Sequence, residues 1–185
     1  APAEAVSAPA WPATTETLAE ARDKAQTALV VAFEAPARRD ADRFAADLIA
    51  GVASGLGGRF FDELRDRQSL AYTVQAYASQ RLLAGTFISY IATSPDREEV
   101  ARRGLLAEFA RLRDVEVAAE ELERAKRYAI GTRAIRQENG GTVLSEIVDA
   151  WLYGAGLAEL EEHDERIRAV TAAQMREMAE RYFVE

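Results

Sequence analysis

All the predicted strands precede Ser94-Pro95 and most of the predicted helices follow it, and this order constrains the fold more than any other feature of the sequence. On the N-terminal side, a buried apolar run predicts a strand over 25–35, and the segments 71–79 and 84–93 predict a hairpin of two further strands. On the C-terminal side, apolar residues recur with the spacing that is typical of helices. This order of elements indicates an α+β fold in which several helices cover one face of an antiparallel sheet.

The expected helices begin and end at residues with capping or breaking chemistry. Asp40 is predicted to cap a helix that ends near Ala53. Ser94-Pro95-Asp96 is predicted to start another, because proline costs no hydrogen bond in a first turn. Thr171 and Gln174 have the spacing of a capping box. The predicted helices span 40–53, 60–67, 95–113, 118–138, 142–153 and two segments within 157–185 that join near Val170.

The helix predicted over 142–153 is expected to turn an apolar side inward, and Trp151 is expected to fill the core between helices. We expect Asn139-Gly140-Gly141 to break the chain before this helix. The residues expected to face inward are Leu144, Ile147, Val148 and Trp151.

The segment 55–72 is the one stretch whose residues indicate contact with another molecule. Its glycines, among them Gly57 and Gly58, are expected to form a turn that lets another chain approach closely. Arg65 is predicted to end a short helix and Tyr72 to open a strand, so that their side chains can converge. A guanidinium and a phenol are suitable donors for a peptide carbonyl or an oxyanion. The alternative is structural: an arginine that complements a helix dipole and a tyrosine that packs across strands.

The sequence of residues 55–74, GLGGRFFDELRDRQSLAYTV, resembles the signature of the second, inactive-type domain of the pitrilysin/insulinase zinc peptidases. This family includes the mitochondrial processing peptidases and bacterial zinc proteases. The resemblance implies that Arg65 and Tyr72 reach across to a zinc-bearing domain and contact substrate. It also implies that the loop with Gly57 and Gly58 guides substrate, and that the fold is the metallohydrolase fold of the processing peptidases.

The same resemblance implies that zinc is bound elsewhere, because the zinc helix of this family carries His-x-x-Glu-His. The chain has a single histidine, His163, and no cysteine. His163 stands among acidic residues and is predicted to lie on a charged, solvated helix face rather than to bind a metal. We therefore expect no catalytic residue and no metal ligand in this chain alone. Zinc is expected in a partner domain on the same or another chain.

The composition agrees with one domain and a single core, since the chain has 185 residues of which 49% are hydrophobic. We expect an Ala- and Pro-rich linker over 1–16 and the peptidase-like domain over 17–185, and we interpret the chain as a piece of a longer protein. The resemblance implies a further strand after the last helix, which the sequence up to Glu185 does not contain, and a sheet without that strand is expected to have an edge open to pairing. The formal charge of -8 argues against a nucleic-acid surface. The longest apolar run, 28–33, is too short to span a bilayer.

The leading hypothesis is a non-catalytic, substrate-binding half of a zinc metallopeptidase that cleaves peptides together with a zinc-bearing partner. The alternative is a binding or assembly subunit on the same fold, as in family members retained in respiratory complexes. An isolated enzyme that uses His163 is a third hypothesis. No residue selects a compartment, and the resemblance to bacterial relatives favours the periplasm over the cytoplasm.

Overall fold

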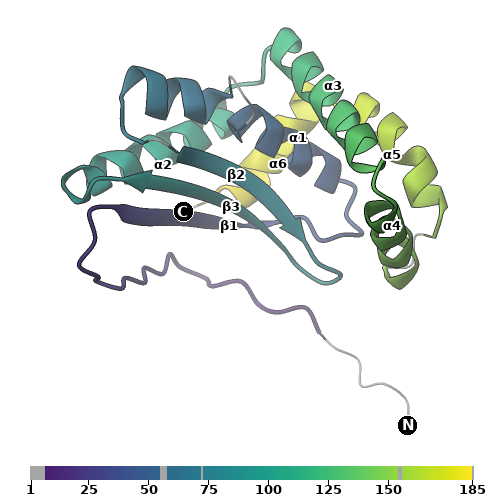
Figure 1. Cartoon of the computed structure of the whole chain (residues 1–185), viewed down its shortest axis with the longest axis horizontal. Helices are drawn as coiled ribbons and strands as arrows, with labels where there is room; N and C mark the ends of the chain where they lie inside the picture. The colour runs from purple at the N-terminus through teal and green to yellow at the C-terminus, as the bar shows by residue number, and fades with distance from the viewer. Residues whose placement is uncertain (1–6, 55–57, 72, 154–155, 185) are drawn as a thin grey trace.

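The computed structural model describes residues 7–54, 58–71, 73–153 and 156–184 (Figure 1). Its strands are β1 (Thr27–Ala35), β2 (Thr73–Gln80) and β3 (Gly85–Thr93), and they form an antiparallel sheet in the order β1-β3-β2. β3 is therefore the central strand, paired to β1 from Thr27↔Thr93 to Ala35↔Gly85 and to β2 through the predicted hairpin. The predicted strands are confirmed to within two residues at each end.

The helices lie on one side of this sheet, and the segment 7–26 runs below β1 in the same view (Figure 1). The α+β prediction is therefore confirmed. The helical elements are α1 (Arg43–Ser54), η1 (Phe61–Arg67), η2 (Pro95–Arg97), α2 (Glu98–Asp114), α3 (Ala119–Arg136), α4 (Gly140–Leu152), α5 (Ala158–Ala169) and α6 (Ala172–Tyr182).

An aromatic cluster lies where the sheet meets the helices. Phe109 of α2 makes edge-on contacts with Phe33 of β1 and Phe87 of β3, with ring centroids 4.8 and 5.8 Å apart. It also contacts Phe60 at 5.3 Å and Phe183 at 4.9 Å. Such edge-on pairs add to the free energy gained by burying the rings. The cluster thus joins two strands, the start of η1 and the end of α6.

The helix predicted over 40–53 begins three residues later than predicted, and the helix predicted over 142–153 begins two residues earlier. α1 begins at Arg43, because the Asp40 carboxylate accepts a hydrogen bond from the Ala37 N–H at 2.8 Å and so closes the preceding turn. α4 begins at Gly140, because Asn139 Oδ1 accepts from Gly141 N at 2.8 Å and caps the helix. The asparagine thus starts the helix at a point where a break was expected. The capping box of Thr171 and Gln174 is confirmed.

The predicted inward face of α4 is wrong. Leu144 is 62% exposed, Val148 is 45% exposed and Trp151 is 67% exposed, while Ala150 is the buried residue of this helix. The apolar period was correctly identified, but it does not say what lies opposite the apolar face. α4 lies beside α5 at one end of the molecule, away from the sheet (Figure 1).

The segment 7–26 is exposed and contains no helix or strand, which leaves the domain boundary at 16/17 a prediction. Within the described ranges, no helix is long and apolar enough to cross a membrane.

Replacing Gly85 by alanine is expected to destabilise the sheet. A Cβ at this position would lie 2.1 Å from Pro36 O and 2.5 Å from Ala35 O, so the backbone of β1 would have to move. We expect Gly85→Ala to lower the free energy of unfolding by at least about 2 kcal/mol in urea denaturation. Gly131→Ala, with no atom within 4 Å of the added carbon, is the control and should stabilise α3 by about 0.5–1 kcal/mol. Equal stabilities would contradict this packing.

Replacing Trp151 tests whether it belongs to the core. Because its side chain is exposed, Trp151→Ser should change the free energy of unfolding by no more than about 0.5 kcal/mol. Phe109→Ala, at the centre of the aromatic cluster, should cost about 3–5 kcal/mol in the same measurement. A comparable loss for both variants would show that Trp151 is buried after all.

Candidate functional site

Residues 58–71, hereafter the motif segment, belong to the family-like sequence 55–74. The helix in this segment, η1, is a π-helix. The Gln68 N–H donates to Glu63 O, five residues earlier, at 3.1 Å. Helices of this type are rare and are often found at functional sites. Phe60 and Leu64 are fully buried and fix the segment to the core. The segment is thus held on its inner side, while the last turn carries Arg65 at the surface.

Arg65 stacks on its own helix. Its guanidinium carbon lies 4.2 Å from the centroid of the Phe61 ring, and its Nε lies 4.0 Å from Asp66 Oδ1. The side chain remains 36% exposed. Stacking on an aromatic face holds the planar guanidinium in one orientation. Arg65 is therefore an ordered and accessible cation in the last turn of η1.

Polar clamps hold both ends of the segment. Arg59 forms a two-pronged ion pair with Glu121 of α3, Nε to Oε1 at 2.9 Å and Nη2 to Oε2 at 2.8 Å. Arg97 donates from Nη1 to Ser69 O at 2.7 Å and from Nη2 to Gln68 O at 3.0 Å. Ser69 has a positive φ of 50°, which is uncommon for a residue other than glycine. The sequence analysis missed these clamps, because each joins residues that are distant along the chain.

The predicted substrate-binding residues are placed only in part. Gly58 is buried, and its carbonyl accepts a hydrogen bond from Asp62 N at 3.0 Å. Gly57 and Tyr72 lie outside the described residues, so the convergence of Tyr72 with Arg65 stays a prediction. In β2, Val74 and Ala76 lie on the covered face, as the alternation predicted.

His163 is less solvated than predicted. It is half-buried on α5, and its ring packs edge-on against Phe44 with centroids 5.8 Å apart. Nδ1 lies 3.2 Å from Asp164 Oδ1, and burial lowers the pKa of the imidazole despite this partner. In the part of the chain that the structure describes, no group of three or more His, Cys, Asp or Glu residues could hold a metal ion. These residues therefore do not fit a zinc centre.

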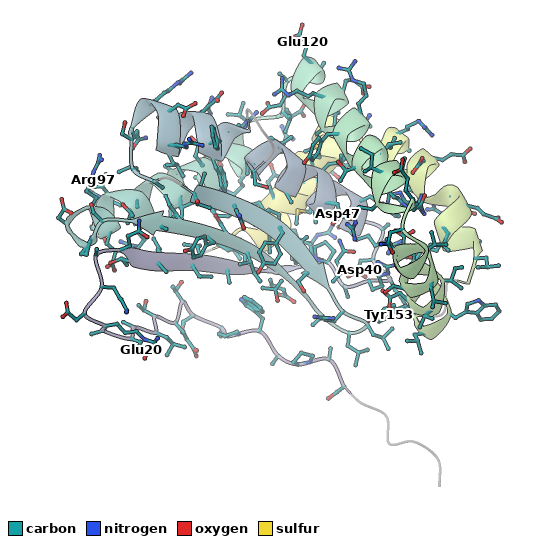
Figure 2. All side chains as sticks on the ribbon, in the orientation of Figure 1. Glu20, Asp40, Asp47, Arg97, Glu120 and Tyr153 are labelled. Atoms are coloured by element: carbon teal, nitrogen blue, oxygen red, sulfur yellow. The ribbon has the colours of Figure 1, made fainter. Side chains whose placement is uncertain are left out.

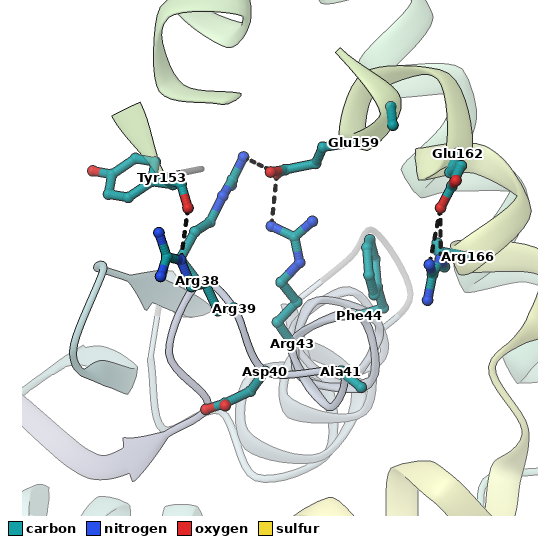
Figure 3. Close-up of a pocket in the computed structure, with 11 residues that line it drawn as sticks. Arg38, Arg39, Asp40, Ala41, Arg43, Phe44, Tyr153, Glu159, Glu162 and Arg166 are labelled. Atoms are coloured by element: carbon teal, nitrogen blue, oxygen red, sulfur yellow. Dashed lines mark hydrogen bonds and ion pairs between the residues drawn. The ribbon is translucent and has the colours of Figure 1, made fainter. Parts of the chain in front are cut away.

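A second polar cluster lies at the N-terminal end of α1 (Figure 3). Glu159 Oε1 of α5 forms an ion pair with Arg38, and it also accepts from Arg43 Nη1 at 2.8 Å. Asp47, one turn further along α1, accepts from Gln80 Nε2 at 2.8 Å. Burial raises the pKa of Asp47 to about 6, although the charges of Arg43 and Arg38 and the Gln80 hydrogen bond favour the ionised form.

Residues 5–128 match the model of a family described as the Peptidase M16 inactive domain. The chain belongs to this family. The resemblance drawn from residues 55–74 to an inactive peptidase domain is therefore confirmed. An uncharacterized zinc protease of Rickettsia bellii is 29% identical over 164 residues, which cover 88% of this chain and 40% of the relative. The M16 domain described here thus spans about two-fifths of the length of that curated relative.

Solved structures show the same fold. A protease from Helicobacter pylori, 17% identical, superposes with a TM-score of 0.80 over 89% of this chain and 40% of its own. An inactive peptidase domain from Bordetella parapertussis, 20% identical, has a TM-score of 0.78 over 91% of this chain and 92% of its own. The second match covers nearly the whole of both chains, so the two share their fold over almost their full lengths.

Asp47 should make the stability of this domain depend on pH. Its folded-state pKa of about 6 lies above the ordinary value of 3.8, so the folded protein binds more protons and stability falls as pH rises through this interval. Asp47→Asn keeps an oxygen for Gln80 and removes the charge. We expect this variant to exceed the wild type by about 2 to 3 kcal/mol at pH 7.5 and to match it near pH 4.

Urea denaturation at several pH values from 4 to 7.5 measures this difference. Asp23→Asn, at an exposed position in the segment before β1, is the control and should follow the wild type at every pH. A difference between Asp47→Asn and the wild type that stays constant across this range would contradict the raised pKa.

Proposed function

We propose that this M16 inactive domain is the non-catalytic, substrate-binding half of a zinc metallopeptidase and that it acts with a zinc-bearing partner domain on the same or another chain. The observation that carries the proposal is the ordered, accessible guanidinium of Arg65. The zinc protease name of the Rickettsia bellii relative supports it, as does the fact that the relative contains much more chain than this domain. Metal and general base would then come from the partner.

Arg65 is suited to bind the backbone of a peptide. A guanidinium offers several N–H donors in one plane, and a peptide carbonyl offers a matching acceptor. Because Arg65 is already stacked on Phe61, less side-chain entropy is lost when substrate binds. Tyr72 would supply a second donor for the oxyanion that develops during cleavage. Gly57 would let substrate approach the backbone closely, whereas the buried Gly58 would support the loop from within.

The rigidity of the segment supports this role. The Arg59–Glu121 pair fixes its start to α3, and the Arg97 hydrogen bonds fix its end to the start of α2. A donor that is placed before substrate arrives stabilises developing charge more than one that must be reorganised. The fixed conformation of the segment would therefore serve to position the Arg65 guanidinium for substrate.

Arg65→Ala is expected to impair peptide cleavage by the domain reconstituted with its zinc-bearing partner. Loss of one such donor costs about 2–4 kcal/mol, which corresponds to a fall in kcat/KM of roughly 30- to 1,000-fold. Cleavage of a fluorogenic peptide measures it. Arg67→Ala is the matched control, because Arg67 lies in the same turn but forms an exposed pair with Glu63, and it should stay within about threefold of wild type.

Size-exclusion chromatography of the same samples separates loss of cleavage from loss of assembly. Wild-type kcat/KM in the Arg65→Ala complex would refute the substrate-binding role. A stable complex that cleaves no peptide with either the wild type or the variants would instead favour the assembly subunit.

A further inference from the structure

A cavity of about 350 Å³ opens at the end of the molecule opposite to the motif segment. In Figure 2, Arg97, which is hydrogen-bonded to the end of that segment, lies at one end of the view, and Asp40 and Tyr153 lie toward the other. The cavity is lined by the turn between β1 and α1 and by residues at the end of α4 and on α5. It is thus separate from Arg65 and does not depend on the proposed peptidase role.

Positive charge is in excess in this cavity. Arg38, Arg39 and Arg43 face the single carboxylate of Glu159, which Arg38 and Arg43 share (Figure 3). Asp47 adds one partly titrated carboxyl behind them. The whole lining holds four arginines, Arg166 among them, against the carboxylates of Asp40, Glu159 and Glu162, so it carries one net positive charge before Asp47 is counted.

The remaining charged residues of the lining are Asp40, Glu162 and Arg166. The Asp40 carboxylate is bonded to Ala37 N, and in Figure 3 it points away from the arginines. Glu162 is paired with Arg166 at 2.9 Å, so that pair adds no net charge. The positive charge closest to Glu159 is thus that of Arg38, Arg39 and Arg43.

Several donors of these arginines lack acceptors. Arg38 Nε is buried without a hydrogen-bond partner. Arg39 donates from Nε to Tyr153 O at 2.7 Å, and its Nη1 and Nη2 have no partner among the described residues. The buried Nε of Arg38 is unfavourable unless a ligand or water satisfies it, whereas Arg39 is exposed and its Nη donors are open to solvent. The open fork of Arg39 matches the two oxygens of a carboxylate.

We propose that this cavity binds the carboxylate of a small organic acid or of a peptide C-terminus. The small excess of positive charge suits a monoanion better than a phosphate dianion. The aromatic rings of Phe44 and Tyr153 in its wall provide an apolar surface for the group that bears the carboxylate. Its volume lies within the range of small-molecule sites. Arg39 would make the principal contact, and Arg38 and Arg43 would fix the local charge.

The test is a titration of the 15N-labelled chain by NMR, with acetyl-Ala-Ala, its C-terminal amide, acetate and inorganic phosphate as probes. We expect saturable shifts of the amides of Ala41, Phe44 and Tyr153 with acetyl-Ala-Ala and none with the amide. Acetate binding as tightly as acetyl-Ala-Ala would identify a small acid as the ligand, and clearly weaker acetate binding would identify a peptide C-terminus.

Arg39→Gln should weaken carboxylate binding at least tenfold, since loss of a charged hydrogen bond costs about 1.5–3 kcal/mol. Arg39→Lys keeps the positive charge but loses the paired Nη donors, so its carboxylate affinity should lie between those of the wild type and Arg39→Gln. Arg127→Gln on α3, an exposed arginine outside the cavity, is the control and should bind as wild type. The proposal is overturned if no carboxylate gives saturable shifts, if the amide or phosphate binds as tightly as the acids, or if Arg39→Gln binds as wild type in a spectrum that shows a folded chain.

Discussion

The edge-on packing of Phe109 against four other phenylalanine rings is the interaction on which the rest of the structure depends. It joins β1 through Phe33, β3 through Phe87 and the C-terminal end of α6 through Phe183. Its contact with Phe60 also fixes the position from which η1 begins. The conformation of the motif segment therefore depends on the core. Substitutions in the aromatic cluster should change the position of Arg65, although the cluster residues contact no substrate.

Hydrogen bonds and an ion pair from neighbouring elements then fix the conformation of the motif segment at the surface. Two residues on different elements bind the motif segment. Glu121 of α3 accepts a hydrogen bond from Arg59. The Thr93 hydroxyl of β3 donates to Leu70 O at 2.7 Å. A backbone carbonyl that is bonded in this way cannot rotate freely. The positive φ of Ser69 persists because such contacts over-determine it. The segment is more rigid than an exposed turn of this length would be alone.

The sequence predicts the parts of this protein that depend on local pattern. The strands, the hairpin and the capping box at Thr171 follow from alternation, turn length and side-chain chemistry. The features that the sequence did not predict depend on which elements pack against each other in the folded chain. The apolar period of α4 does not reveal that Trp151 faces solvent, and nothing near Arg39 in the sequence shows that Tyr153 will lie beside it. Arg65 was identified through the motif, whereas its stacking on Phe61 required coordinates.

The strand order β1-β3-β2 has a consequence for how the chain folds during synthesis. β2 and β3 are joined by a short turn and can pair as soon as both have left the ribosome. β1 is made first, yet its partner is β3, so Thr27 must wait until Thr93 has been added. Closing that long loop costs entropy and slows folding. Phe183 is made later than the strands and α2, and until it packs against Phe109 the nascent chain exposes part of the aromatic cluster to chaperones and to other chains.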